Sequence, residues 1–513
     1  MNTAGKRPYR TVFAMITATL FSKLLGMARS MMMAWTLGDS VHAVAFAAAS
    51  KIPGAVFDLL LSAAIVGCFI PTYNKAKEES ENAAHEYSCS FLFAALSVCV
   101  LLSALGMILS PVIIKLSSPG ISAEASALSS SLLRIMFPMM IFASGVYTLT
   151  GIMQSAGSFI LPASVSSVSN VFIIVYLVAA KDNFSVYTLS FVYVISWFLQ
   201  FATLCVPLIY KKLIPVPSLR RKNRYLAESL RHAPEVMMGA WFAPASVFIA
   251  AFFSSFVADT AFVTYDYAFG IYTIISGVAV YGVGNYVFPS LSRLYAKNEI
   301  SEFTLELKNS AFRMLAIVLP IFCASSILSY EGVTLLYLRG NFTDTLARDC
   351  AKALSALSFA MPACAISEIL SRAFYASGKS RVPMYASLAA IAASVIFNSV
   401  SMLFQKGVVG ISLSFAAAEW CHAALLAAFL NVKFHGIFKL TDAADVLTLA
   451  APCAASALAM ALFKKIFSFR GISDQTLLLF FKITIVFTLS LVIYLLCIYS
   501  LRYFSKKIKK EKR

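Results

Sequence analysis

The sequence predicts an all-α polytopic membrane protein with about 14 transmembrane helices. Of its 513 residues, 60% are hydrophobic and only 13% are charged, whereas a soluble domain has about 25% charged residues. Apolar stretches recur at lengths near the roughly 20 residues that a membrane-spanning helix needs. A third observation, an internal repeat, predicts two six-helix halves in a parallel arrangement, followed by a C-terminal helix pair.

Fourteen apolar segments are expected to span the membrane. Several contain proline or glycine, which membrane helices tolerate where neighbouring groups satisfy the backbone. In chain order the segments are 11–36, 43–72, 87–116, 127–154, 158–180, 185–210, 233–258, 262–290, 311–331, 351–376, 383–404, 410–432, 443–467 and 476–503.

Two short motifs recur in the second half of the chain at nearly the same spacing. Phe69-Ile70-Pro71 ends the second segment and Val287-Phe288-Pro289 ends the eighth, while 157–162 and 378–383 each run from a glycine to a proline between two segments. The spacing covers an even number of segments, so both copies have the same topology and form a parallel repeat. The predicted parts are the halves 1–210 and 233–432, a basic linker 211–232, an additional helix pair 433–503 and a basic tail 504–513.

The distribution of Lys and Arg predicts the orientation. Most of them lie in the loops on the side of the N-terminus, in 211–231 and in the C-terminal tail, and cytoplasmic loops carry such an excess. Both termini are therefore expected in the cytoplasm. The net charge of +18 does not require a nucleic-acid partner, because basic tails also meet anionic membrane lipids. For the linker, an interfacial amphipathic helix and a solvated loop are alternatives.

The first apolar segment contains two cations, Lys23 and Arg29, with Gly26 between them. Six residues correspond to about 600° of helical turn, which leaves the cations within roughly 120° of each other. A charge deep in a spanning helix is costly, so two on one side predict a water-filled cavity that attracts an anion. The alternative is that both side chains extend to a headgroup layer, for which Lys23 lies too deep.

Other charges within the apolar segments are candidate gating groups or ion pairs. Asp58 has two expected partners, Lys51 two turns earlier or a cavity cation, and its role is either structural or gating. Asp266 lies near the start of its segment and faces either water or the cavity. Glu368 and Arg372 are four residues apart in the favourable order, which predicts a self-satisfied pair, with gating as the alternative.

Several function classes lack their sequence patterns. The ten cysteines form no CxxC pair and the five histidines no HxxxH pair, so neither a metal nor a cofactor is predicted. The chain has no phosphate-binding glycine loop and no nucleophile elbow. We therefore expect a transporter that is neither an enzyme nor driven by its own ATP hydrolysis.

The stretch Phe21-Ser22-Lys23-Leu24-Leu25-Gly26-Met27-Ala28-Arg29 resembles the first-helix signature of the MurJ (MviN) lipid II flippases of the MOP exporter superfamily. Lys51-Ile52-Pro53 and Leu336-Tyr337-Leu338-Arg339-Gly340-Asn341-Phe342-Thr343 resemble further motifs of that family. The resemblance implies a protein of the bacterial cytoplasmic (inner) membrane. Such a protein moves lipid II, the undecaprenyl-pyrophosphate-linked peptidoglycan precursor, between leaflets by alternating access.

The resemblance also implies a site and partners. The site would be a central cationic cavity in which Lys23, Arg29, Lys51 and Gly26 bind the substrate. The helix pair in 433–503 would hold the lipid tail. Besides lipid II and anionic lipids, the implied partners are proteins of cell-wall synthesis or division.

The chain departs from the family pattern at several positions. His42 lies where an acidic residue is usual, and Asp58 and Gly270 lie where arginines are usual. Met402, one turn after Asn398, offers no carboxylate for the sodium site of some members. These departures leave open a flippase for another lipid-linked oligosaccharide. A MATE-like drug or cation antiporter and a non-transporting scaffold are further alternatives; the first generally needs carboxylates, and the second gains nothing from deep cations.

Overall fold

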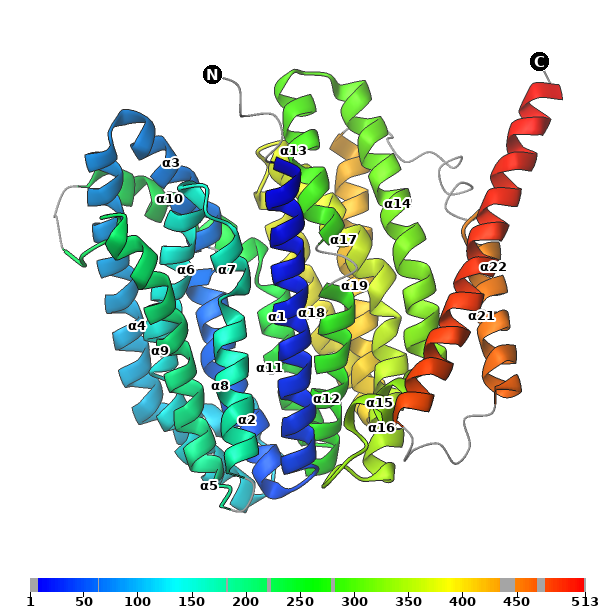
Figure 1. Cartoon of the computed structure of the whole chain (residues 1–513), viewed down its shortest axis with the longest axis horizontal. Helices are drawn as coiled ribbons and strands as arrows, with labels where there is room; N and C mark the ends of the chain where they lie inside the picture. The colour runs from blue at the N-terminus through cyan, green and yellow to red at the C-terminus, as the bar shows by residue number, and fades with distance from the viewer. Residues whose placement is uncertain are drawn as a thin grey trace. The chain divides into compact units, whose positions relative to one another are not determined.

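The computed structural model describes residues 8–62, 64–180, 183–218, 223–277, 282–433, 448–467 and 476–511. Within these ranges the chain is helical and contains no strand. Long helices dominate Figure 1, and the outer faces of several, such as α4 and α22, expose many large apolar side chains. Exposed apolar side chains in such numbers are typical of contact with lipid. The predicted class, an all-α polytopic membrane protein, is confirmed.

The chain divides into two compact units, Met1–Val263 and Thr264–Arg513. The predicted linker 211–232 lies inside the first unit, and its residues 219–222 are outside the described residues. Residues 512–513 of the predicted tail also lie outside the described residues. The described end of the linker contains the start of a helix, Arg224–Gly239, whose first turn Asn223 caps through its side chain.

The first unit contains thirteen described elements before α12. They are α1 (Pro8–Leu37), α2 (Val41–Phe57), the π-helical turns η1 (Asp58–Ser62) and η2 (Ile65–Phe69), α3 (Ile70–Glu79), α4 (Glu81–Ser117), α5 (Ala123–Met136), α6 (Met139–Ser155), α7 (Ile160–Ser164), α8 (Ser166–Ala179), α9 (Val186–Tyr210), α10 (Arg224–Gly239) and α11 (Phe242–Ser255). The side chains of Ser40, Ser80 and Ser122 cap α2, α4 and α5. Pro138, which cannot donate a helical hydrogen bond, stands where α5 and α6 meet at a bend of 44°.

The second unit continues from α12, which crosses the boundary between the units. Its elements are α12 (Asp259–Ser276), α13 (Gly282–Ala296), α14 (Ile300–Ile327), α15 (Ser329–Tyr337), α16 (Asp344–Ser358), α17 (Ala360–Ala376), α18 (Arg381–Leu403), α19 (Gly407–Lys433), α21 (Ala450–Ile466) and α22 (Thr476–Glu511). Helix α19 packs against α16, α17 and α18, and the last two helices pack against each other. The described parts of 433–503 thus contain a helix pair.

The predicted count of fourteen spans is not confirmed. Among the described residues, nine helices are long and apolar enough to cross a membrane, or eleven if two bent pairs each count as one span. The bent pairs are α5 with α6 and α10 with α11. The first predicted segment, 11–36, lies within the single 30-residue helix α1.

Candidate functional site

Helix α1 packs closely against α8 on the face that contains Ser22 and Gly26. The hydroxyls of Ser22 and Ser166 are 2.5 Å apart, and the Asn170 side-chain amide donates to the Ser22 carbonyl at 3.2 Å. A Cβ at Gly26 would lie 3.4 Å from Asn170 Nδ2. The structure therefore places Gly26 at the contact with α8, where an added Cβ would make only ordinary contact with the Asn170 side chain.

Arg29 lies against an aromatic ring of α9. Its Cζ is 5.8 Å from the ring centroid of Tyr193, within the range of a cation–π interaction. The Tyr193 hydroxyl donates to Met33 Sδ at 3.1 Å, and its ring meets Phe46 of α2 edge-to-face at 5.1 Å. Because three side chains from two helices hold this ring, it fixes the direction of the Arg29 guanidinium.

Lys23 and Arg29 of α1 have no acidic partner among the residues that the structure describes. Both side chains are half-buried, and Arg29 Nε is buried without a hydrogen-bond partner. Unneutralised guanidinium and ammonium groups in such surroundings form strong charge-assisted hydrogen bonds with an anion. Lys23 and Arg29 are therefore candidates for binding an anion.

Lys51 and Asp58 lie on the next helix and its continuation. Lys51 is half-buried on α2, whereas Asp58 is exposed at the start of η1. The described polar neighbours of Asp58 are Ser62 and Tyr147, so the structure does not show the predicted pairing with Lys51. Tyr193 contacts Met33 of α1 and Phe46 of α2, the two helices that carry Arg29 and Lys51.

In the second unit, Glu368 and Arg372 form the ion pair that their spacing predicts. Arg372 donates to Glu368 Oε1 through two nitrogens, at 2.5 and 2.8 Å. Asp266 is half-buried on α12 and has a polar or aromatic partner. Asp266, Glu368 and Arg372 belong to the second unit, whereas Lys23 and Arg29 belong to the first.

Two buried acids escaped the sequence reasoning. Glu331 of α15 pairs with Lys464 of α21 at 2.9 Å, and Glu419 of α19 lies 3.4 Å from His422. The sequence does distinguish Glu419, because it is the only acidic residue in the predicted segment 410–432. An inventory of acids within the apolar segments, made in the same way as that of the cations, would have found it.

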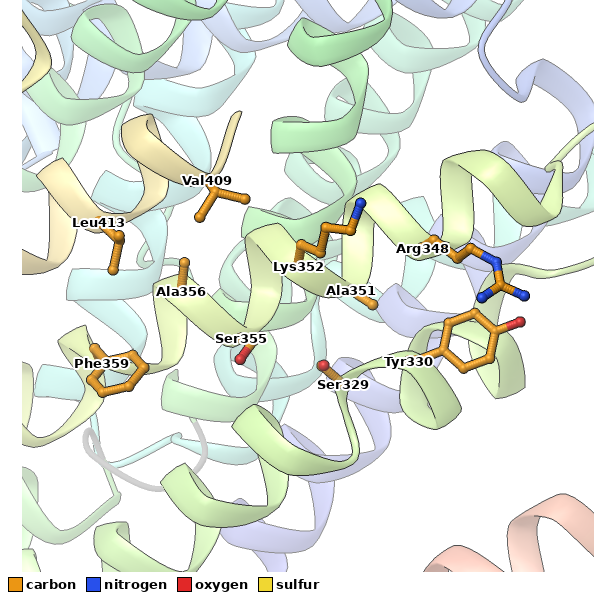
Figure 2. Close-up of a pocket in the computed structure, with 10 residues that line it drawn as sticks. All are labelled: Ser329, Tyr330, Arg348, Ala351, Lys352, Ser355, Ala356, Phe359, Val409 and Leu413. Atoms are coloured by element: carbon orange, nitrogen blue, oxygen red, sulfur yellow. The ribbon is translucent and has the colours of Figure 1, made fainter. Parts of the chain in front are cut away.

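A cavity of about 670 Å³ opens in the second unit between α15, α16 and α19. Figure 2 shows Arg348 beside Tyr330 at one end and Phe359 with Leu413 at the other. Arg348 bonds Asp344 at 2.7 Å and Lys352 bonds Asp349 at 2.8 Å. Both cations are therefore neutralised locally, and none of the predicted site residues lines this cavity.

Comparisons with known proteins match this chain to a single family of membrane proteins. A family model described as "Lipid II flippase MurJ" matches residues 33–499. A "Probable lipid II flippase MurJ" of Buchnera aphidicola subsp. Schizaphis graminum (strain Sg) is 29% identical over 436 residues, which cover 83% of each chain. A "Lipid II flippase MurJ" of Burkholderia cenocepacia is 22% identical over 443 residues, covering 84% of this chain and 85% of the relative.

Solved structures agree on the fold. A structure titled "Lipid II flippase MurJ, inward closed conformation" superposes with a TM-score of 0.76 at 20% identity, covering 94% of this chain and 98% of the other. An inward-facing multidrug resistance MATE family transporter of the MOP superfamily superposes with a TM-score of 0.67 at 13% identity, covering 83% and 98%. At these identities the likeness concerns the fold alone.

Proposed function

Because the chain belongs to the MurJ family of lipid II flippases, we propose that it translocates lipid II across the bacterial cytoplasmic membrane. The observation that carries the proposal is the pair of unneutralised cations on α1, Lys23 and Arg29. A translocated pyrophosphate needs cations that are available to it, and cations already paired with carboxylates would first have to be released. This function is transport and requires no covalent chemistry.

The chemistry of the two cations suits a pyrophosphate. A guanidinium offers a planar fork of donors to phosphate oxygens, whereas an ammonium is a compact charge on a flexible stem. Tyr193 holds Arg29 in one direction, so Arg29 would define the register of the pyrophosphate while Lys23 and Lys51 supply further charge. Gly26 lies about one turn from both Lys23 and Arg29 on α1 and adds no side chain between them.

The lipid tail requires a different surface. We place it along the helix pair α21 and α22, where Leu477, Phe480 and Phe481 are exposed. Long aliphatic chains gain from contact with such side chains and need not leave the membrane. The polar headgroup alone would then pass through the protein, by the alternating-access mechanism of related transporters.

The remaining expectations belong to the same proposal. Both termini lie in the cytoplasm, and the basic C-terminal end meets anionic lipids. Proteins of cell-wall synthesis or division are the proposed protein partners. Glu368 and Arg372 form a structural pair, whereas Asp58 and Asp266 are available for gating.

The deciding experiment is complementation of bacterial cells depleted of their own lipid II flippase. Wild type is expected to restore growth, and Arg29→Ala at the same membrane level is not. Lys352→Ala is the matched control, because that lysine is exposed, bonded to Asp349 and remote from α1 in the chain. If wild type reaches the membrane and fails to rescue, the substrate is another lipid-linked oligosaccharide, in line with the arginines that the family usually has and this chain lacks.

A further inference from the structure

Helix α19 carries a carboxylate and an imidazole inside the second unit. Glu419 Oε2 lies 3.4 Å from His422 Nδ1, and the two side chains are 8% and 12% exposed. The other oxygen, Oε1, accepts a hydrogen bond from the Ser367 hydroxyl of α17 at 3.3 Å. Ionisable side chains within a membrane span are costly and are typical of ion and proton pathways.

Two other acids of the same unit are neutralised in a different way. Glu331 has Lys464 at 2.9 Å, and Glu368 has Arg372 at 2.5 Å. Lysine and arginine keep their charge throughout the physiological pH range, so those pairs are permanent. Of these three carboxylates, Glu419 alone faces a histidine, a side chain that often serves as a proton shuttle.

The surroundings of Glu419 and His422 are formed by the helices that pack against α19, which include α16, α17 and α18. On α17, Cys364 interacts with both Glu419 and Glu368, and Arg372 compensates Glu368. Helix α18 has no charged side chain after Arg381, and α16 has none after Lys352. On α12, Tyr272 contacts Cys364 and packs against Phe415 of α19. Among the residues that the structure describes, no lysine or arginine forms an ion pair with Glu419.

We propose that Glu419 and His422 form a proton-binding site within the second unit. With one shared proton the pair is neutral overall, either as carboxylate with imidazolium or as carboxylic acid with imidazole. A second proton taken from water gives the pair a charge of +1, and its release to water restores neutrality. A carboxylate and an imidazole both bind protons, and the described residues contain no group of three or more His, Cys, Asp and Glu side chains that could hold a metal ion.

Loading of this site would change the contact between α17 and α19. The Ser367 hydroxyl donates to a carboxylate more strongly than to a neutral carboxylic acid. Protonation of Glu419 therefore weakens a bond that joins the two helices. A proton site placed at a helix contact couples proton binding to the packing of the unit.

The first test measures protonation directly and does not depend on transport. Infrared difference spectra of the purified full-length protein in lipid vesicles are recorded as the pH is raised. Wild type is expected to lose a protonated-carboxyl band that is absent from Glu419→Gln and present in Glu368→Gln, the matched control. His422→Asn should shift the midpoint of the titration. An identical band in Glu419→Gln, no band in wild type, or an unshifted midpoint in His422→Asn would overturn the proposal.

The second test rests on the proposed function. It distinguishes a failure of the proton-binding proposal from a failure of the lipid II proposal. Lipid II translocation is measured in vesicles with and without a pH gradient of one unit. If one proton moves per cycle, the driving force changes the transport equilibrium about tenfold, and Glu419→Gln should lose this response. A wild-type rate that ignores the gradient overturns the coupling, whereas a wild type with the infrared band but no translocation overturns only the lipid II function.

Discussion

The guanidinium of Arg29 lies over the ring of Tyr193, with 5.8 Å between Cζ and the ring centroid. This contact joins the helix that carries the candidate anion-binding cations to α9. The ring is itself held by Met33 and Phe46. The first unit therefore orients Arg29 with an uncharged partner and leaves its charge available to a ligand.

Removal of either cation of α1 should strongly reduce lipid II translocation. A charge-assisted hydrogen bond contributes about 1.5–3 kcal/mol, so Arg29→Ala and Lys23→Ala are each expected to slow transport by roughly ten- to hundredfold. Arg29→Glu should be worse, because it repels the pyrophosphate. Translocation of labelled lipid II in vesicles measures the effect, and normal transport by both alanine variants would remove the central argument for the site.

Tyr193 should act on transport through its ring and not its hydroxyl. A cation–π contact contributes about 0.5–2 kcal/mol, so Tyr193→Leu is expected to raise the apparent KM for lipid II by roughly two- to thirtyfold. Tyr193→Phe keeps the ring and should stay close to wild type. Equal defects in the two variants would show that the hydroxyl bond to Met33 matters instead.

Two glycines should respond differently to alanine. At Gly26 the new Cβ meets a side-chain amide at 3.4 Å, which is ordinary contact, so Gly26→Ala should leave stability near wild type. At Gly120 it would lie 2.5 Å from the backbone carbonyl oxygen of Ser255, and such overpacking costs about 1–3 kcal/mol. Thermal unfolding of the purified protein in detergent compares them, and a lower Tm for Gly26→Ala than for Gly120→Ala would contradict the described packing.

The ion pair of Glu331 and Lys464 should stabilise the packing of α21 against α15 within the second unit. Lys464→Met leaves the 4%-exposed Glu331 without its cation. The expected loss is about 3 kcal/mol, the low end of the range for a broken buried pair, because Lys464 is itself one-third exposed. Adding Glu331→Gln to Lys464→Met should recover part of the Tm; a double variant less stable than the single one would argue against the ion pair.

Cys323 and Cys453 offer a chemical test of the contact between α14 and α21. Their sulfurs are 3.4 Å apart, on α14 and α21. Mild oxidation with copper phenanthroline should join them in a disulfide, each thiol losing one proton and one electron to the oxidant. Peptide mapping should find the linked peptides in wild type and not in Cys323→Ser, and failure to form the link in folded wild type would place α21 elsewhere.

Local patterns predicted the helical class and the Glu368–Arg372 pair, because both depend on spacing along one helix. The pair on α1 was likewise visible as two cations in one apolar segment. The role of Tyr193 was not predictable, since it depends on the packing of α9 against α1 and α2, which lie more than a hundred residues earlier in the chain. Glu419 and His422 could have been noticed, but their contact with Ser367 and Cys364 depends on how α17 packs against α19.

The wide turns η1 and η2 make the second span sensitive to chain length. They hold five residues each between α2 and α3, and the Leu59 carbonyl in η1 accepts a bond from the Trp241 indole at 2.8 Å. A one-residue deletion there would rotate everything downstream by about 100°. Phe69 would then turn away from Tyr87 and Phe91, whose rings it now meets at 5.4 and 4.7 Å. Insertions and deletions within η1 and η2 should therefore be tolerated far less than most single substitutions.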